Sequence, residues 1–162
     1  MGVKRQRDER NRVLATNKLA HREFEIVETL ECGIQLTGSE VKSLREAKAR
    51  LDEAFARVVR GELWLIGMHI SPYAFGHGVG AHTPDRQRKL LVHRSELLRW
   101  QSIAEQQHLA LVPLQVYLKD GRIKVELGMG RGRKSYDKRQ VLARRDADLE
   151  ARRALADARR AR

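Results

Sequence analysis

The sequence predicts a mainly β domain, a small antiparallel barrel with helices at its periphery. About six short apolar segments bounded by turn residues indicate strands, two glycine-containing pivots join four of them into hairpins, and only two or three segments repeat at helical spacing. Barrels of this size remove free sheet edges by closing, and many of them bind nucleic acid. A sandwich of two sheets is the alternative that the same pattern allows.

The first predicted elements follow a basic, weakly hydrophobic leader. Alternating apolar positions predict a half-buried strand over residues 24–30, and residues 32–36 predict a second short strand after a bend. Residues 37–39 contain a turn and a candidate N-cap. A short helix is therefore expected over about 40–47.

A hairpin is expected in the middle of the chain, with arms at 54–60 and 62–70 around Arg60-Gly61, because both arms are rich in strand-forming residues. Pro72 should end the second arm. The loop 73–87 that follows is long, and such loops in compact domains are usually functional or mobile. Residues 89–92 are too few to classify by their period.

A helix is expected over residues 95–107, since its apolar side is marked at helical spacing by Leu97, Leu98, Ile103 and Ala104, with Trp100 less well placed. A second hairpin is expected to join 109–119 to 122–129 around Asp120-Gly121, a strong turn signal.

The second hairpin contains further signals. Pro113 indicates a sheet edge or a bulge, because proline cannot donate to the strand ladder. The glycine-rich segments 76–80 and 128–132 lack the spacing of phosphate-binding loops and are predicted to be flexible connections. The buried core is expected to include Leu97, Ile103, Val112, Leu114, Val116 and Val125.

Most of the net charge of +12 lies at the two ends of the chain, with +3 in residues 1–12 and +7 in residues 131–162. The pattern predicts a disordered basic leader (1–12), a barrel domain (13–130) and a basic tail (131–162) that is disordered alone and helical against a partner. Cations that neutralise phosphates release counterions, so such basic ends indicate binding to nucleic acid. The alternative is that the tail is solvated and only aids solubility. The tail lacks the Trp, Phe and Ile that insert into membranes, so no membrane partner is expected.

Neither an enzyme nor a cofactor is supported by the residue pattern. His77 and His82 lack cysteine or carboxylate partners at metal-site spacing, so no metal is expected. An enzyme that uses these two histidines of loop 73–87 stays an alternative hypothesis. Cys32, the one cysteine, is expected to act as a small buried hydrophobe. Without a recognisable signal peptide or membrane-spanning segment, we expect a cytoplasmic protein.

Seven segments, in this order, resemble the motifs of one known family: NKLAH at 17–21, GSEVKSLR at 38–45, GELWL at 61–65, HISPY at 69–73, RKLL at 88–91, LVPL at 111–114 and GRKSYDKR at 132–139. Each motif alone is weak, but the ordered set is highly specific. The family is small protein B, the transfer-messenger-RNA-binding protein of trans-translation.

The resemblance implies a closed six-stranded barrel of oligonucleotide-binding (OB) type with about three helices, and no enzymatic activity. It also implies that the barrel binds the tRNA-like domain of transfer-messenger RNA, largely on one face, through Asn17, Lys18, Phe24, Glu31, Arg45, Lys89 and Leu91. A carboxylate near phosphates is tolerated if it accepts hydrogen bonds from base edges, which is the role expected of Glu31. A salt bridge to a neighbouring Lys or Arg is the alternative for this residue.

By the same resemblance, the protein delivers this RNA to stalled ribosomes. Its tail is expected to occupy the empty mRNA channel and decoding site, against small-subunit rRNA, through Arg131, Arg133, Lys134, Tyr136, Asp137, Lys138 and Arg139. Tyr136 is the candidate for stacking on decoding-site bases, and Asp137 for capping the helix that follows. The free chain is expected to be a monomer, and a general RNA chaperone or ribosome-associated RNA-binding protein is the alternative function.

The chain departs from the family pattern at one place. The family usually has His before an acidic residue and a Tyr, whereas Arg22-Glu23-Phe24 stands here, with His21 one step earlier. Phe24 can still stack on a base or ribose, but it cannot donate a phenolic hydrogen bond.

Overall fold

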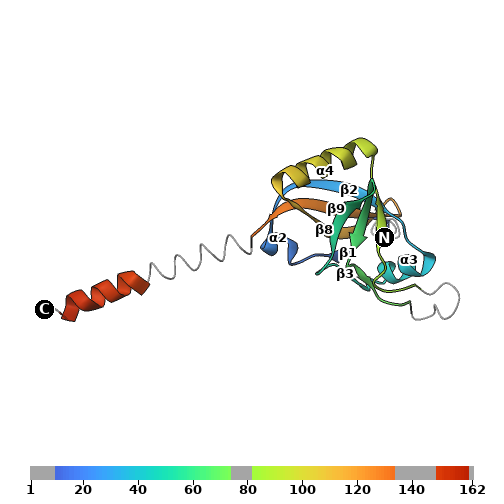
Figure 1. Ribbon diagram of the computed structural model, residues 1–162. Coiled ribbons are helices and arrows are strands. Elements are labelled where there is room, and N and C mark those ends of the chain that lie inside the picture. The colour runs from blue at the N-terminus through green and yellow to red at the C-terminus, as the bar shows by residue number, and fades with distance from the viewer. Residues whose placement is uncertain (1–9, 74–81, 134–148, 161–162) are drawn as a thin grey trace.

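Strands are the main secondary-structure elements of the folded part of the chain (Figure 1). The computed structural model describes residues 10–73, 82–133 and 149–160. The strands are β1 (Arg12–Thr16), β2 (Phe24–Ile34), β3 (Ala49–Arg50), β4 (Phe55–Val59), β5 (Glu62–Ile66), β6 (His69–Ile70), β7 (Arg88–Leu91), β8 (Ala110–Lys119) and β9 (Arg122–Gly132). The helices are α2 (Ala20–Glu23), α3 (Gly38–Arg45) and α4 (Arg94–Gln107), and residues 149–160 are also helical. The mainly β class is therefore confirmed.

Six of the strands are hydrogen-bonded in a ring, in the order β8-β4-β5-β7-β2-β9 and back to β8. Every pairing in the ring is antiparallel. β1 pairs with β8 as a further strand of the same sheet, and β3 pairs with β6 in a separate two-stranded sheet. The inner side chains of the ring form the main core, in which Cys32, Leu65, Val116, Val125 and Leu127 have no exposed surface.

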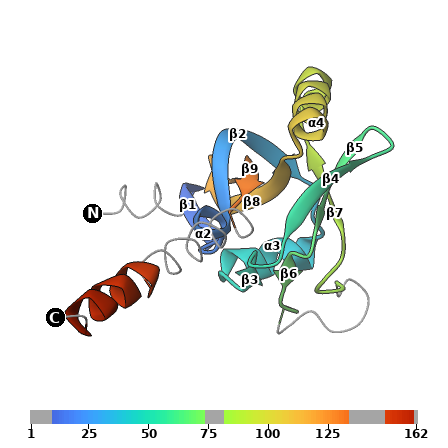
Figure 2. The ribbon, with the colours of Figure 1, turned by 60° about the vertical axis from the view of Figure 1, so that its left-hand side comes forward.

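Helices α3 and α4 lie on opposite sides of the ring (Figure 2). Leu44 of α3 and Trp100 of α4 both join the main core, at 0% and 2% exposure. On the outside, the guanidinium of Arg99 donates to both carboxylate oxygens of Glu28, which holds α4 against β2. The two helices thus cover the openings that a ring of strands leaves.

β2 is one strand of eleven residues, so the predicted pair of short strands with a bend between them is wrong. Glu31 and Cys32 continue the pairing with Glu126 and Val125 of β9 without a break. The irregularity falls earlier, where the register shifts between Ile26 and Glu28. A bulge of this kind turns the side chains that follow to the other face.

Both predicted hairpins are confirmed. Arg60 and Gly61 have φ values of 51° and 75°, and Asp120 and Gly121 have 51° and 78°, as two-residue hairpin turns require. The predicted bulge at Pro113 is also confirmed, since the register of β8 against β9 shifts just after it. The second arm of the first hairpin, predicted over 62–70, is interrupted. β5 ends at Ile66, and residues 69–70 form β6, which pairs with β3 instead.

β9 continues to Gly132, so the prediction of a flexible connection over residues 128–132 is wrong. A Cβ atom on Gly128 would lie 3.1 Å from the Leu114 side chain, and one on Gly130 would lie 2.9 Å from the Glu25 carbonyl oxygen and 3.1 Å from the Phe24 Cβ. Glycine therefore lets neighbouring strands and side chains lie directly against β9. The role of these residues is close packing within a strand rather than flexibility.

The predicted helix at 95–107 is confirmed, but its predicted apolar side is partly wrong. Trp100 is buried, whereas Leu98 is 53% exposed. Ile103, expected in the core, is only partly buried, while the other five expected core residues are buried. A helical period alone does not fix which part of an apolar stripe meets the sheet.

The start of the described chain is attached to the β8–β9 turn. The Gly121 amide donates to the Arg10 carbonyl over 3.1 Å, and the Asp120 amide donates to Asn11 Oδ1 over 3.1 Å. β1 then begins at Arg12, within the segment expected to be a disordered leader. Residues 1–9 lie outside the described part of the chain.

Candidate nucleic-acid interface

Four of the predicted RNA-binding residues lie on one outer face of the ring, on the neighbouring strands β2 and β7. Glu31 and Gly33 alternate along β2, and Gly33 pairs with Leu91 of β7. A Cβ on Gly33 would lie 3.2 Å from the Leu91 Cβ, so these positions share a face. Lys89, two residues before Leu91, also points outward, because it alternates with the buried Arg88 and Leu90.

Phe24 belongs to the same face in spite of its odd spacing from Glu31. Gly128 of β9 pairs with Thr29, which alternates with Glu31, and Gly130 pairs with Ile26 on the other side of the bulge. Side chains of Leu114 and Ile26 lie over these two glycines, on the outer side. The bulge thus keeps Phe24 and Ile26 on the face of Glu31, about 20 Å along the strand at 3.3 Å per residue. We call Phe24, Glu31, Lys89 and Leu91 the outer face.

A second, smaller hydrophobic cluster supports the Phe24 end of the outer face. Ala20 of α2 is buried there with Val112 and Leu114 of β8, and Phe24 packs against them half-buried. Val112 and Leu114 were expected in the core. They are buried, but on the outside of the ring, because the bulge after Pro113 turns this part of β8 over. Phe24 is held by packing while part of its ring stays open to solvent.

Glu31 lies in the middle of the outer face and has charged and polar neighbours. The Tyr117 hydroxyl donates to Oε2 over 2.5 Å, and Lys119 Nζ lies 3.2 and 3.3 Å from Oε1 and Oε2. The Tyr117 hydroxyl first, and Lys119 after it, hold the pKa of Glu31 below its ordinary value. The salt bridge weighed as the alternative for Glu31 is therefore present in the unbound chain. A carboxylate has about four acceptor positions, so a further donor can still be accepted.

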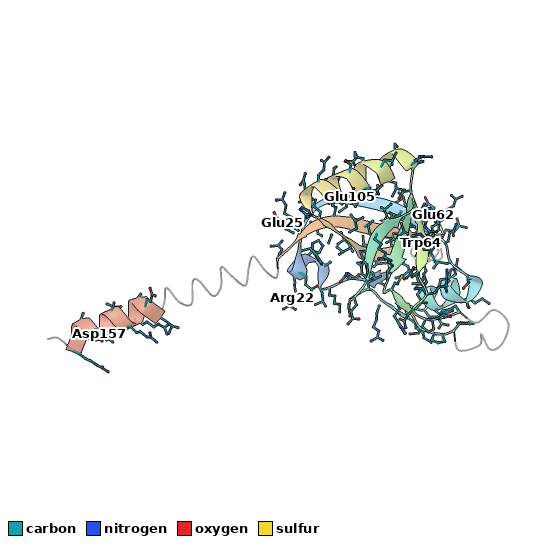
Figure 3. The ribbon with its side chains drawn as sticks, viewed as in Figure 1. Arg22, Glu25, Glu62, Trp64, Glu105 and Asp157 are labelled. Carbon is teal, nitrogen blue, oxygen red and sulfur yellow. The ribbon has the colours of Figure 1, made fainter. Side chains whose placement is uncertain are left out.

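Lys89 and Leu91 form the other end of the outer face. Lys89 Nζ lies 3.2 Å from Oε1 of Glu62, and Lys89 pairs in register with Trp64. Glu62 and Trp64, both labelled in Figure 3, alternate along β5 and share its outward side. Leu91 is 45% exposed. This end therefore combines a cation, an aromatic ring and an exposed leucine.

The other three predicted contacts of the domain are placed differently. Asn17 is buried, and its side-chain amide donates to the Pro113 carbonyl over 2.9 Å. Its position fixes the bulge of β8. Lys18 is exposed in the turn before α2. Arg45 is exposed at the end of α3, which packs against β1 and β6 rather than against the outer face.

Two of the seven predicted tail residues lie in the described chain. Arg131 is exposed in β9, with Nη2 3.3 Å from Oε1 of Gln107. The Arg133 amide donates to the Glu23 carbonyl over 2.7 Å, so the strand pairing reaches this residue. Lys134, Tyr136, Asp137, Lys138 and Arg139 lie outside the described residues, and the helical residues 149–160 are all exposed.

A buried ion pair between α3 and β7 was not found from the sequence. Glu40 and Arg88 are both fully buried, and Arg88 Nε donates to Glu40 Oε2. Burial opposes the charge on Glu40, but hydrogen bonds from the Thr37 amide, Arg86 and Arg88 outweigh it and hold the pKa of Glu40 well below its ordinary value. Both residues stand in motifs that carry the family resemblance, and their role here is to hold α3 against β7.

His82, considered above as a metal ligand, has two protein partners. Its Nδ1 lies 2.9 Å from Ser39 Oγ, and its Nε2 donates a hydrogen bond to the Ile70 carbonyl oxygen over 3.0 Å. His77 lies outside the described residues. Among residues 10–73, 82–133 and 149–160, no three His, Cys, Asp or Glu side chains form a cluster that could hold a metal ion. In the same ranges, no helix is long and apolar enough to span a membrane.

A ring of antiparallel strands with exposed aromatic, apolar and charged side chains on one outer face is typical of small nucleic-acid-binding β domains. The family model described as SmpB protein matches residues 14–157. The chain is 49% identical to the SsrA-binding proteins of Desulforudis audaxviator and Syntrophotalea carbinolica, over 90% of this chain and 95% and 97% of theirs. The chain belongs to the SmpB family, which is a family of RNA-binding proteins and not of enzymes.

A solved structure agrees with this assignment. The chain in "tmRNA-SmpB: a journey to the center of the bacterial ribosome" is 45% identical, with a TM-score of 0.61 over 73% of this chain and 82% of that one. Most of the fold is therefore shared with a protein studied in complex with RNA.

Proposed function

We propose that this chain binds the tRNA-like domain of transfer-messenger RNA and delivers it to stalled ribosomes for trans-translation. The relatives are named for binding SsrA, and the solved relative is named together with transfer-messenger RNA and the ribosome. The observation in this chain that supports the proposal is the outer face, where Phe24, Glu31, Lys89 and Leu91 come together from β2 and β7. On this proposal the six-stranded ring acts as a barrel of OB type, and the protein works as a monomer in the cytoplasm.

The outer face suits RNA rather than regular duplex DNA. RNA loops and elbows are recognised by shape, by stacking and by hydrogen bonds to base edges. Phe24 offers a ring for stacking, Leu91 an apolar contact, and Lys89 a charge for phosphate. Glu31 would accept hydrogen bonds from base amino or imino groups, a role for which its carboxylate is already oriented by Tyr117 and Lys119.

The tail completes the proposed function. Arg131, Arg133, Lys134, Lys138 and Arg139 would follow the phosphates of the empty mRNA channel, and Tyr136 would stack on decoding-site bases. Asp137 would cap the helix that forms there. The exposed apolar side chains of the helical segment, Leu149 and Leu155, are 51% and 63% exposed and would then meet the ribosome.

Binding of the RNA tests the outer face. Glu31→Ala should weaken binding of the tRNA-like domain clearly, while the thermal midpoint stays nearly unchanged, because an exposed ion pair contributes only about 0–1 kcal/mol. Glu46→Ala is the matched control, since Glu46 is an exposed glutamate 3.1 Å from Lys48 Nζ on a different part of the surface. Equal affinities of the two variants would remove Glu31 from the interface.

Two tail variants test delivery. A chain ending at Arg133 keeps all of β9 and its bond to Glu23, so it should fold and bind the RNA but should not support tagging on stalled ribosomes. A tail scrambled over 134–162 at constant composition should fail in the same way. Normal tagging with the scrambled tail would mean that the tail is only a charged tether.

Recovery of a heterogeneous RNA mixture with the purified protein would favour a general RNA chaperone instead.

A further inference from the structure

A groove lies beside the Lys89 and Leu91 end of the outer face. Its lining comes from the β4–β5 turn, from β7 and from the first turns of α4. The groove is therefore built by three separate elements of the fold, two of them outside the outer face. Two residues, Lys89 and Leu91, belong to both surfaces, so the groove continues the outer face toward α4.

One part of the groove lining is apolar and open to solvent, and we call it the floor. Leu91 of β7 and Leu98 of α4 line it, and they are 45% and 53% exposed. The core does not need Leu98, because Leu97, Trp100 and the partly buried Ile103 and Ala104 make the apolar contacts of α4 with the main core. Two large aliphatic side chains from different elements thus face solvent in one groove, where a partner would remove them from water.

Another part of the lining is cationic, and we call it the rim. Arg60 at the β4–β5 turn, Lys89 on β7 and Arg94 at the start of α4 line it. Among the described residues, the one lining carboxylate is Glu62, which is paired with Lys89. Arg60 and Arg94 are both exposed. Guanidinium groups bind phosphate oxygens in a planar, two-donor geometry. An apolar floor with an arginine-rich rim matches one nucleotide, which has an apolar base face and an anionic phosphate.

We propose that this groove holds one unstacked nucleotide of the bound RNA, with its base on Leu91 and Leu98 and its phosphate against Arg60 and Arg94. Bases in RNA loops can leave the stack and enter such surfaces. The proposal rests on the proposed function and adds Arg60, Arg94 and Leu98 to the interface. A peptide with an acidic and an apolar residue would be a different occupant, and the test separates the two.

The test uses full-length protein and the isolated tRNA-like domain of transfer-messenger RNA. Arg60→Ala and Arg94→Ala should each weaken binding and lower the slope of log K against log salt, and the two decreases together should come to about 0.7–0.9, the value of one lost phosphate contact. Leu98→Ser should weaken binding about fivefold, as expected for an apolar contact of ~1 kcal/mol, without changing the salt dependence. Arg50→Ala is the control, because Arg50 is an exposed arginine on the separate β3–β6 sheet.

The outcomes separate the two proposals. If the wild-type chain does not bind the RNA, the proposed function fails. If the wild-type chain binds, but the three groove variants bind as tightly as the Arg50→Ala control, only the groove proposal is refuted, and a protein occupant becomes the explanation of the exposed leucines. Weaker RNA binding by the arginine variants but not by Leu98→Ser would also refute the groove proposal, because the base would then not lie on the groove floor. Unchanged thermal midpoints of all four variants would show that a loss of RNA affinity is not caused by unfolding.

Discussion

Replacing Glu40 by glutamine should strongly destabilise the fold, because Glu40 neutralises a fully buried arginine. The Glu40 carboxylate accepts hydrogen bonds from the Thr37 amide over 2.9 Å, from Arg86 Nη2 over 2.5 Å and from Arg88 Nε. Arg88 has no exposed surface, and it also donates to the Met68 carbonyl over 2.8 Å and the Pro84 carbonyl over 3.0 Å. Glutamine has nearly the same shape, so the change removes the charge but creates little cavity.

The size of the effect follows from the burial of both partners. Leaving one member of a buried ion pair without its counter-charge costs about 3–5 kcal/mol, a large part of the stability of a domain of this size. The cost should depend on pH. The folded-state pKa of Glu40 is lowered, so its contribution is complete above its ordinary pKa of 4.5 and is lost as pH falls through the lower folded-state value.

Urea unfolding followed by circular dichroism, at pH 7 and at pH 3, measures both effects. Glu40→Gln should be less stable than the wild type at pH 7, and the difference should shrink at pH 3. The double variant Glu40→Leu with Arg88→Met should recover much of the loss, since no buried charge is then left unpaired. A loss below about 1 kcal/mol at pH 7 would refute the reasoning, because that is the value of an exposed ion pair.

Two further predictions concern buried positions of β9 and β2. Gly130→Ala should cost about 1–3 kcal/mol in thermal melts, because its Cβ would lie 2.9 Å from the backbone carbonyl of Glu25; Gly132→Ala, with nothing within 4 Å, is the control, and equal melting of the two variants would contradict the packing described for β9. Burial raises the pKa of the Cys32 thiol to about 12, so a thiol reagent at pH 8 should label the protein only at the rate of unfolding, and rapid labelling of the native protein would show that Cys32 is accessible.

The hairpins could be predicted from the sequence because their signals are local. Arg60-Gly61 and Asp120-Gly121 bring glycine to turn positions of positive φ, and strand-forming residues stand on both sides of each pair. Helix α3 was predicted for the same reason, although it starts two residues earlier than expected, directly after the Thr37 N-cap. In each of these elements, the residues that decide the structure are neighbours in the chain.

The errors arose where a distant segment decides the outcome. β1 went unpredicted because its partner β8 lies about a hundred residues away in sequence. Gly128 and Gly130 were interpreted as flexible, since nothing local shows that Leu114 and the backbone of β2 need their space. Leu98 was placed on the buried side of its helix because the helical period does not show where the sheet lies.

The candidate site was predicted partly by resemblance and partly by strand alternation. The family resemblance named Glu31, Lys89 and Leu91, and the β2–β7 pairing brings them to one face. Asn17, named in the same way, is buried against the Pro113 bulge, where a structural role is expected. The groove residues Arg60, Arg94 and Leu98 come from a turn and a helix, so no single motif could have joined them.

Competition binding tests the central claim most directly. The labelled tRNA-like domain of transfer-messenger RNA is titrated with the wild-type chain, with and without an excess of an ordinary tRNA, and the same titration is repeated with Glu31→Ala. We expect wild-type binding to withstand the competitor and the Glu31→Ala variant to lose most of this preference while it keeps its thermal midpoint. Equal displacement of both proteins by ordinary tRNA would contradict the account, because the outer face would then bind RNA without selecting the transfer-messenger RNA.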